Sequence, residues 1–211
     1  MNCDRIARWY RFLEHVVFGR ALERRRFEYL NRVDGLRRVL MLGEGDGRFT
    51  AEFVKRNPMA EVDSVELSQG MLALARKRVE HELSAARVRF FLGDARTIEF
   101  PGHYDLIVTH FFLDCFPESE LQGLVARVSK LCSPGGRWLI SEFSLPPAGL
   151  RRVAAGMLIR FMYLLFRITT GLKVNRLPDY APVLTANGFR VVGQCSAAGG
   201  LLVSELWERA L

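Results

Sequence analysis

Three glycines have the spacing of a turn that binds a nucleotide-like ligand. Gly43, Gly45 and Gly47 follow the apolar run 38–42, and a helical pattern begins directly after them. Glycine lets the chain turn tightly and lets backbone N–H groups approach a ligand without an intervening Cβ. This signal is weak by itself, because glycine-rich turns occur in many folds.

Two acidic residues strengthen the prediction of a ligand site. Glu66 closes a second apolar run, 62–66, and Asp94 follows a third run, 88–92. If these runs are neighbouring parallel strands, their carboxyl ends lie at one edge of a sheet, where the ligands of such sheets bind. The pattern therefore predicts one site built from three consecutive strand ends.

The chain alternates strands and helices around these turns. From Arg37 on, apolar runs of strand length are separated by segments with helical periodicity. Such alternation predicts a parallel sheet with helices on both faces. Strands are expected near 37–42, 61–66, 87–92, 104–110 and 136–143, and helices near 47–56, 69–82 and 118–131.

The C-terminal part departs from this alternation. An apolar helix near 150–168 and a short helix near 178–187 lead into two strands, 188–195 and 201–207, with no helix between them. The glycine-containing link between these strands permits an antiparallel hairpin. We therefore expect a Rossmann-like, doubly wound α/β fold, with a mostly parallel seven-stranded sheet, an antiparallel last strand and helices on both faces.

Composition and charge limit the class of protein. The 211 residues are 49% hydrophobic and 25% charged, which predicts a single domain, 1–211, that buries a core without disulfides. The four cysteines lie far apart and the N-terminus has no apolar secretory segment, so we expect a cytoplasmic protein. The net charge of +7 suits an anionic partner, but the run Arg24 to Arg26 favours a solvated helix face.

Five segments carry a resemblance to a known family. They are the glycine loop 39–47, the segments 65–72 and 93–95 after the second and third strands, the fourth strand 104–108, and 131–136 before the fifth. In this order and spacing they resemble the class I S-adenosylmethionine-dependent methyltransferases, in particular the branch that acts on small molecules such as quinones. The resemblance covers nearly the whole chain.

The resemblance implies S-adenosylmethionine as cofactor and S-adenosylhomocysteine as product. Glu66 would accept hydrogen bonds from both ribose hydroxyls. Asp94 would accept from the adenine amino group, and the Ala95 N–H would donate to the ring. A surface acid at Glu66 and a helix N-cap at Asp94 are the alternatives. The other expected cofactor contacts are Tyr10 in the N-terminal helices 1–33, Gly43, Glu44, Gly45, Gly47, Leu67, Met71 and His110.

One position departs from the family pattern. The family usually has an acid where Met41 stands, two residues before the first glycine, and that acid helps to organise the methionine end of the cofactor. Glu44 and Asp46 lie within the loop instead. We expect them to take over the contact with the cofactor ammonium.

The segment after the fourth strand contains the candidate bases. His110 and Asp114 lie where an acceptor should approach, and histidine can titrate near neutral pH. His110 could equally line the cofactor or pack in the core, and Asp114 could cap the helix that follows. Methyl transfer from an activated sulfonium is a direct displacement, so no metal is expected.

The expected acceptor is a small, apolar or aromatic molecule methylated at an O or C centre. The segment after His110 lacks the Asn/Asp-Pro-Pro-aromatic motif that amino methyltransferases in this family usually show. An RNA or protein methyltransferase and an inactive cofactor-binding scaffold are the alternatives, although a nucleic-acid partner is not favoured. A dinucleotide-binding oxidoreductase is disfavoured, because Arg48 replaces its third glycine and an acidic loop would repel a diphosphate.

The inserted helical region 148–187 leaves three readings open. Its first helix is mostly apolar, yet Arg152, Gly156, Arg160, Tyr163 and Arg167 form one narrow stripe. A membrane span is not expected, because Arg160 interrupts a short run. The helix could be an acceptor lid, a dimer surface or a peripheral membrane contact. We favour the lid, whose pocket would be lined by Phe111, Phe112, Met157 and Phe161, in a monomer or homodimer.

Overall fold

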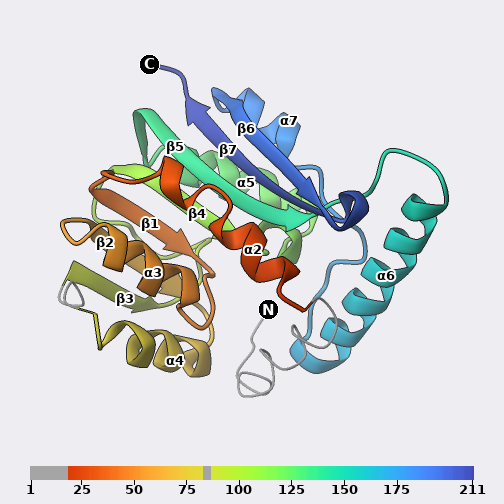
Figure 1. Cartoon of the computed structure of the whole chain (residues 1–211), viewed down its shortest axis with the longest axis horizontal. Coiled ribbons are helices and arrows are strands. Elements are labelled where there is room, and N and C mark those ends of the chain that lie inside the picture. Colours follow the sequence, from red (N-terminus) through yellow and green to blue (C-terminus); the bar gives the residue numbers. More distant parts are fainter. Residues whose placement is uncertain (1–18, 83–86) are drawn as a thin grey trace.

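One mixed sheet organises the protein. The computed structural model describes residues 19–82 and 87–211, which form a seven-stranded sheet in the order β3-β2-β1-β4-β5-β7-β6 (Figure 1). This topology confirms the predicted fold class. The strands are β1 (Arg38–Leu42), β2 (Glu61–Glu66), β3 (Val88–Leu92), β4 (Tyr104–His110), β5 (Cys132–Phe143), β6 (Phe189–Ala197) and β7 (Leu202–Arg209).

The strand directions place a crevice beside β1. β1 to β5 pair in parallel, whereas β7 runs antiparallel to both of its neighbours, β5 and β6. The strand order reverses between β1 and β4. In doubly wound sheets such a reversal opens a ligand crevice at the carboxyl ends of the strands. The glycine turn that follows β1 begins at this point.

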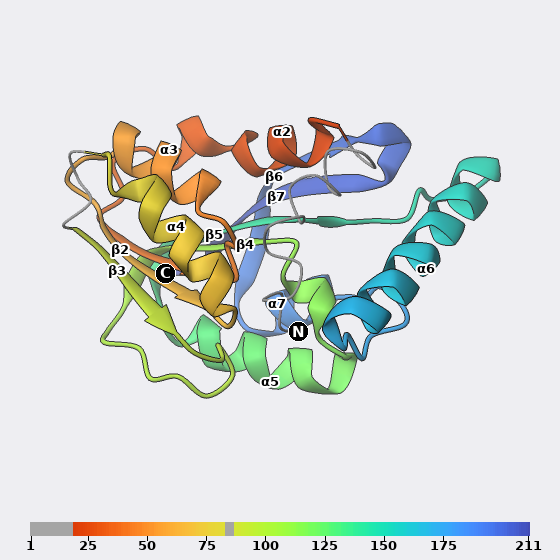
Figure 2. The ribbon, with the colours of Figure 1, turned by 90° about the horizontal axis from the view of Figure 1, so that it is seen from below.

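Helices cover both faces of the sheet. Figure 2 shows α2, α3 and α4 on one face and α5 and α7 on the other. Val39 and Met41 of β1 pack toward the first group, in a cluster with Phe49, while Leu40 and Leu42 pack toward the second. These helices are α2 (Ala21–Phe27), α3 (Arg48–Arg56), α4 (Gln69–Val79), α5 (Glu118–Ser129) and α7 (Ala181–Ala186). Burial on both faces explains why β1 is apolar from Val39 to Leu42.

Two differences from the sequence-based boundaries have a clear physical reason. β5 begins four residues earlier than predicted, because Cys132 pairs with Tyr104 before the register shifts. α7 has six residues and begins only at Ala181, with Pro182 in its first turn. Proline is favoured at a helix start and lacks the N–H that a longer helix would need there.

The long helix α6 (Leu150–Thr170) stands apart from these two layers. Figures 1 and 2 show it beyond the edge at which the parallel strands end. Its inner face buries Ala155, Ile159, Met162 and Tyr163 in a third apolar cluster. Phe111 and Cys115, which follow β4, pack against the same cluster, so α6 forms an outer wall next to the ends of the central strands.

Candidate functional site

A pocket lies at the carboxyl ends of β1, β2, β3 and β4, where the sequence predicted a ligand site. It brings together most of the predicted residues, from segments far apart in the chain. Its lining consists of Arg26, Gly43, Glu44, Gly45, Asp46, Arg48, Val65, Glu66, Leu67, Met71, Gly93, Asp94, Ala95, Arg96, His110, Phe111, Phe112, Cys115 and Phe116.

The three glycines of the turn have different roles. All have positive φ, the region that favours glycine. A Cβ on Gly43 would lie 2.1 Å from a Phe112 ring carbon, and one on Gly47 would lie 2.6 Å from the Ala75 backbone, where α3 meets α4. A Cβ on Gly45 would meet nothing within 4 Å. Gly45 therefore offers its backbone to the open pocket, whereas Gly47 does not line it and serves helix packing.

Glu66 is tied to this turn by hydrogen bonds. Its Oε2 accepts from the Gly45 N–H at 3.2 Å, and its Oε1 accepts from the Ser68 N–H at 2.9 Å. Burial raises the pKa of Glu66, while the backbone donors oppose that rise. Each carboxylate oxygen can accept a further hydrogen bond. The side chain is thus fixed in position with acceptor capacity toward the pocket.

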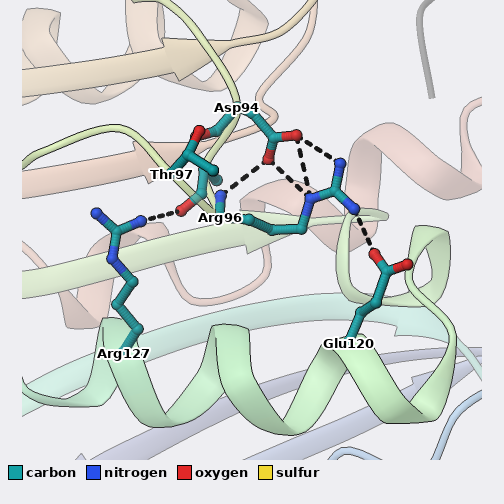
Figure 3. A network of polar contacts seen from close by, with 6 residues as sticks. Asp94, Arg96, Thr97, Glu120 and Arg127 are labelled. Atoms are coloured by element: carbon teal, nitrogen blue, oxygen red, sulfur yellow. Dashed lines mark hydrogen bonds and ion pairs between the residues drawn. The ribbon is translucent and has the colours of Figure 1, made fainter.

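Asp94 is held by an arginine. Its Oδ1 accepts from the Arg96 backbone N–H at 2.9 Å, and its carboxylate pairs with the Arg96 guanidinium at 2.5 Å (Figure 3). The same guanidinium reaches Glu120 on α5, and Arg127 on α5 donates to the Ala95 carbonyl oxygen. Arg96 lowers the pKa of Asp94, so this carboxyl is ionised at neutral pH.

Apolar side chains line the pocket between these two acids. Leu67 is 38% exposed, whereas Met71 and Ala95 are buried. Met71 is fixed at the start of α4, because its N–H donates to Oγ of the N-cap residue, Ser68, at 3.2 Å. These residues give the pocket an apolar wall beside its carboxylates, as a site for a planar base requires.

Both acids of the glycine loop line the pocket, and each is also held by hydrogen bonds or ion pairs within the protein. Glu44 accepts from the Phe49 N–H at 2.8 Å and from Thr50 Oγ1 at 2.9 Å, at the first turn of α3. Burial, with a smaller contribution from Asp46, raises the pKa of Glu44 to about 7. Asp46 pairs with Arg48 and Arg78. The expected contact of Glu44 and Asp46 with the cofactor ammonium stays a prediction, and Asp46 would make it while paired with two arginines.

Met41 occupies a fully buried position. Its side chain packs on the α3 side of the sheet, and the Thr50 hydroxyl donates to its sulfur at 3.2 Å. An apolar residue fits this surrounding because a carboxylate here would be desolvated.

His110 ends β4 at the floor of the pocket. Its ring lies edge-on to the Phe49 ring, and the two ring centroids are 4.6 Å apart. Neither nitrogen of the imidazole has a hydrogen-bond partner within the described part of the chain. Burial, helped by the charge of Arg26, lowers the pKa of His110 well below its ordinary value. The imidazole is therefore neutral at physiological pH and can accept a hydrogen bond.

Asp114 lies outside the pocket lining, behind Cys115. Tyr163 of α6 is 3.5 Å from its carboxylate, and burial raises the pKa of Asp114 to about 6. Glu142, at the end of β5, is a buried neighbour whose Oε1 accepts from the Leu113 N–H at 2.7 Å. Burial and the nearby Asp114 raise the pKa of Glu142 well above its ordinary value. These groups stabilise the segment after β4 and do not face the pocket.

Residues 39–136, which include the glycine turn, Glu66 and Asp94, match a family of methyltransferase domains. This part of the chain, residues 39–136, is a methyltransferase domain. A ubiquinone/menaquinone biosynthesis C-methyltransferase, UbiE, from Dinoroseobacter shibae is 32% identical over 54% of this chain and 46% of that protein. The chain spans about half the length of the first curated relatives it matches.

Solved structures share the fold of this methyltransferase domain. An O-methyltransferase family protein from Burkholderia thailandensis has a TM-score of 0.70 at 21% identity, over 97% of this chain and 57% of that one. A magnesium protoporphyrin IX methyltransferase from Synechocystis, solved with S-adenosylhomocysteine, has a TM-score of 0.63 at 17% identity, over 90% of this chain and 82% of that one. Both likenesses show the fold.

The residues present fit the cofactor of the methyltransferase class. Gly45 leaves open space where a Cβ would stand, and Glu66 and Asp94 each present a fixed carboxylate to the pocket. Glu66 ends β2 and Asp94 follows the neighbouring strand β3, so the two acids suit a ligand that offers ribose hydroxyls at one point and a base amino group at another. Tyr10, also expected at this site, lies outside the described residues.

Sequence reasoning missed several residues of this methyltransferase pocket and misplaced two others. Arg26 is only 6% exposed and lines the pocket, so the reading of Arg24 to Arg26 as a solvated face is wrong for this residue. Met157 and Phe161, expected to line the acceptor side, are 60% and 64% exposed on the outer face of α6. Glu142 was also missed, although an acid within the apolar end of β5 is a signal that could have indicated a buried carboxyl there. Arg96, Cys115 and Phe116 gave no signal of their own.

Proposed function

We propose that the protein transfers the methyl group of S-adenosylmethionine to an oxygen or carbon centre of a small aromatic acceptor. One observation carries this proposal. The pocket lining combines one group, the glycine turn with Glu66 and Asp94, with a second group, His110 and several aromatic side chains. The aromatic side chains are Phe111, Phe112 and Phe116.

The first group would hold the cofactor. Glu66 would accept from the ribose hydroxyls, Asp94 would accept from the adenine amino group, and the Gly45 backbone would face the amino-acid end. Bound S-adenosylmethionine supplies an activated methyl group on its sulfonium, which leaves by in-line displacement. The protein's task is then to align the acceptor and to manage its proton.

The second group would orient the acceptor. Phe111 has a φ of 53°, a conformation that non-glycine residues rarely adopt, and Arg26 lies 5.2 Å from its ring centroid. Strain of this kind is concentrated at functional sites. The ring is held between Arg26 and Phe143, whose ring centroid is 5.1 Å away. A planar apolar acceptor would stack among such rings.

His110 would accept the acceptor's proton. The neutral imidazole has unpartnered nitrogens within the described residues and lies at the pocket floor. For a hydroxyl acceptor, the oxygen forms a bond to the methyl carbon, the bond from that carbon to sulfur breaks, and the hydroxyl proton moves to the imidazole. For a ring carbon of a hydroquinone, the proton lost comes from that carbon or from its neighbouring hydroxyl.

Methyl transfer from labelled S-adenosylmethionine tests this proposal. The acceptors would be phenols, catechols and reduced quinones, with mass spectrometry to distinguish O-methyl from C-methyl products. His110→Ala should lower kcat by about 100-fold or more while leaving S-adenosylhomocysteine affinity within a few fold. His103→Ala, which removes an exposed histidine before β4, is the matched control.

The outcomes separate the proposal from its alternatives. Labelled product from an aromatic acceptor, lost in His110→Ala and kept in His103→Ala, would support it. Transfer to transfer RNA or to a protein, with none to small aromatics, would contradict the acceptor class. Tight S-adenosylhomocysteine binding with no transfer to any acceptor would point to a cofactor-binding scaffold.

A further inference from the structure

The outer face of α6 carries a continuous apolar ridge. Six large apolar side chains recur at steps of three or four residues, so they lie in one line along the helix. All six are more than half exposed. We call these residues the α6 ridge: Leu150 (89%), Val153 (58%), Met157 (60%), Phe161 (64%), Leu164 (55%) and Ile168 (72%). A contiguous exposed patch of this kind marks an interaction surface.

The segment around the ridge holds most of the chain's excess positive charge. Residues 144–178 contain no acidic residue, while the whole chain has a net charge of +7. Arg160 and Arg167 are exposed and lie two turns apart on one flank of the ridge. The cations of this segment are Arg151, Arg152, Arg160, Arg167, Lys173 and Arg176. The partner of the ridge should therefore combine an apolar interior with a negatively charged surface.

The contacts of the inner face of α6 determine whether the helix can cross a membrane or only lie on its surface. By length and composition the helix could cross a membrane. However, Ala155, Ile159, Met162 and Tyr163 are buried against the rest of the protein, and Arg160 stands at the helix midpoint. If α6 crossed a membrane, these side chains would lose their contacts with the core and Arg160 would lie at the bilayer centre. The helix can instead lie flat, with its ridge outward.

We propose that α6 docks on the surface of an anionic phospholipid membrane. The ridge enters the boundary between headgroups and acyl chains, and the flanking arginines contact anionic headgroups. A second copy of the chain fits less well. In a two-fold dimer through the ridge, the arginines of both copies would lie along one interface, with no acid on α6 to pair with them.

The position of α6 connects this surface to the pocket. Phe111 and Cys115 line the pocket and pack in the same apolar cluster as the inner face of α6. A membrane held on the outer face would bring membrane-dissolved apolar molecules close to the aromatic side chains of the pocket. Docking itself does not depend on methyl transfer, so it can be measured without cofactor or acceptor.

Vesicle sedimentation of the full chain tests the proposal. The probes are vesicles of phosphatidylcholine alone and of phosphatidylcholine with about one third phosphatidylglycerol. The protein should sediment with the anionic vesicles, and high salt should weaken this binding. Met157→Gln with Phe161→Gln should weaken it by about tenfold or more, because two inserted apolar side chains are lost. Arg160→Gln with Arg167→Gln should weaken it by roughly fivefold for each cation removed.

A matched control removes exposed apolar side chains from another surface. Met59 and Leu92 are 64% and 54% exposed, far from α6, so Met59→Gln with Leu92→Gln should leave vesicle binding unchanged. S-adenosylhomocysteine affinity, measured on every variant, reports whether the fold and the cofactor site survive. A loss of vesicle binding with that affinity retained would support the proposal.

Three results would overturn the proposal. The first is absence of binding to anionic vesicles by the wild-type protein. The second is a dimer in solution that Met157→Gln with Phe161→Gln converts to a monomer, because a second copy would then cover the ridge. The third is resistance to extraction from membranes by alkaline carbonate, which would indicate a spanning helix. None of these results bears on the cofactor site, so they leave the proposed methyl transfer intact.

Discussion

The Glu66 carboxylate and the Gly45 N–H are joined by a hydrogen bond of 3.2 Å, which links the end of β2 to the turn that follows β1. The two strands are neighbours and parallel, so their ends meet without any side chain having to reach across the sheet. The bond fixes the carboxylate where a ribose would lie. It also fixes the glycine turn, whose open position at Gly45 faces the pocket.

Gly43→Ala should destabilise the fold and weaken cofactor binding together. Its Cβ would stand 2.1 Å from Phe112, so the ring must leave its place in the pocket. We expect a loss of about 2–4 kcal/mol in the free energy of unfolding, from the positive φ and the overpacking together. Urea denaturation and calorimetric titration with S-adenosylhomocysteine would measure the two effects.

Gly35→Ala is the control for that prediction. Gly35 also has positive φ, at 81°, but a Cβ there would meet nothing within 4 Å. The free energy of unfolding of this variant should fall by only about 1 kcal/mol, and its affinity for S-adenosylhomocysteine should equal that of the wild type. If both variants lost the same free energy of unfolding, the contact of the new Cβ with Phe112 would contribute nothing to the effect of Gly43→Ala.

Glu44 should make the stability of the protein depend on pH. Its pKa in the folded state is about 7, above the ordinary 4.5, so the folded protein holds the proton across this interval while the unfolded chain releases it. The contribution of Glu44 to stability therefore falls as the pH rises from 4.5 to 7, by about 3 kcal/mol at most.

The comparison with Glu44→Gln isolates this effect from other buried groups, because glutamine keeps the neutral acceptor and cannot titrate. Free energies of unfolding of both proteins would be measured across the same interval. The variant should gain stability relative to wild type as the pH rises. Parallel curves for the two proteins would contradict the assignment.

Asp94 should recognise the amino group of adenine. In the wild-type protein, S-inosylhomocysteine, which carries an oxygen in place of that amino group, should bind about tenfold more weakly than S-adenosylhomocysteine. In Asp94→Ala the two ligands should bind alike. Glu120→Gln is the control, because it removes only the far partner of Arg96 and should keep the preference for adenine.

The architecture was predictable because its signals are local. A parallel strand buried on both faces is apolar throughout, as at Val39 to Leu42, and the groups that follow such strands fall at one edge of the sheet. This reasoning located the glycine turn, Glu66 and Asp94. It could not locate Arg26, because the direction in which α2 presents its three arginines is set by packing against the sheet.

The sequence also could not predict which face of α6 points outward. The helix is apolar on two opposite faces, so periodicity did not indicate which face packs against the protein. The expectation for Met157 and Phe161 was wrong for this reason, since Ile159 and Met162 are the buried residues. Glu142 was missed because a single acid at the end of a strand resembles a surface residue until its burial is known.

Calorimetric titration of the wild-type protein and Glu66→Gln with S-adenosylhomocysteine tests the central claim most directly. The amide keeps the size of the side chain but loses the charge that strengthens its hydrogen bonds, and it cannot accept at both positions. We predict binding by the wild type at one site and a loss of about 30-fold or more in Glu66→Gln. Glu61→Gln, at the other end of β2, should bind as wild type does. Equal affinity in Glu66→Gln and wild type, or no binding by the wild type, would contradict the assignment of this pocket to the cofactor.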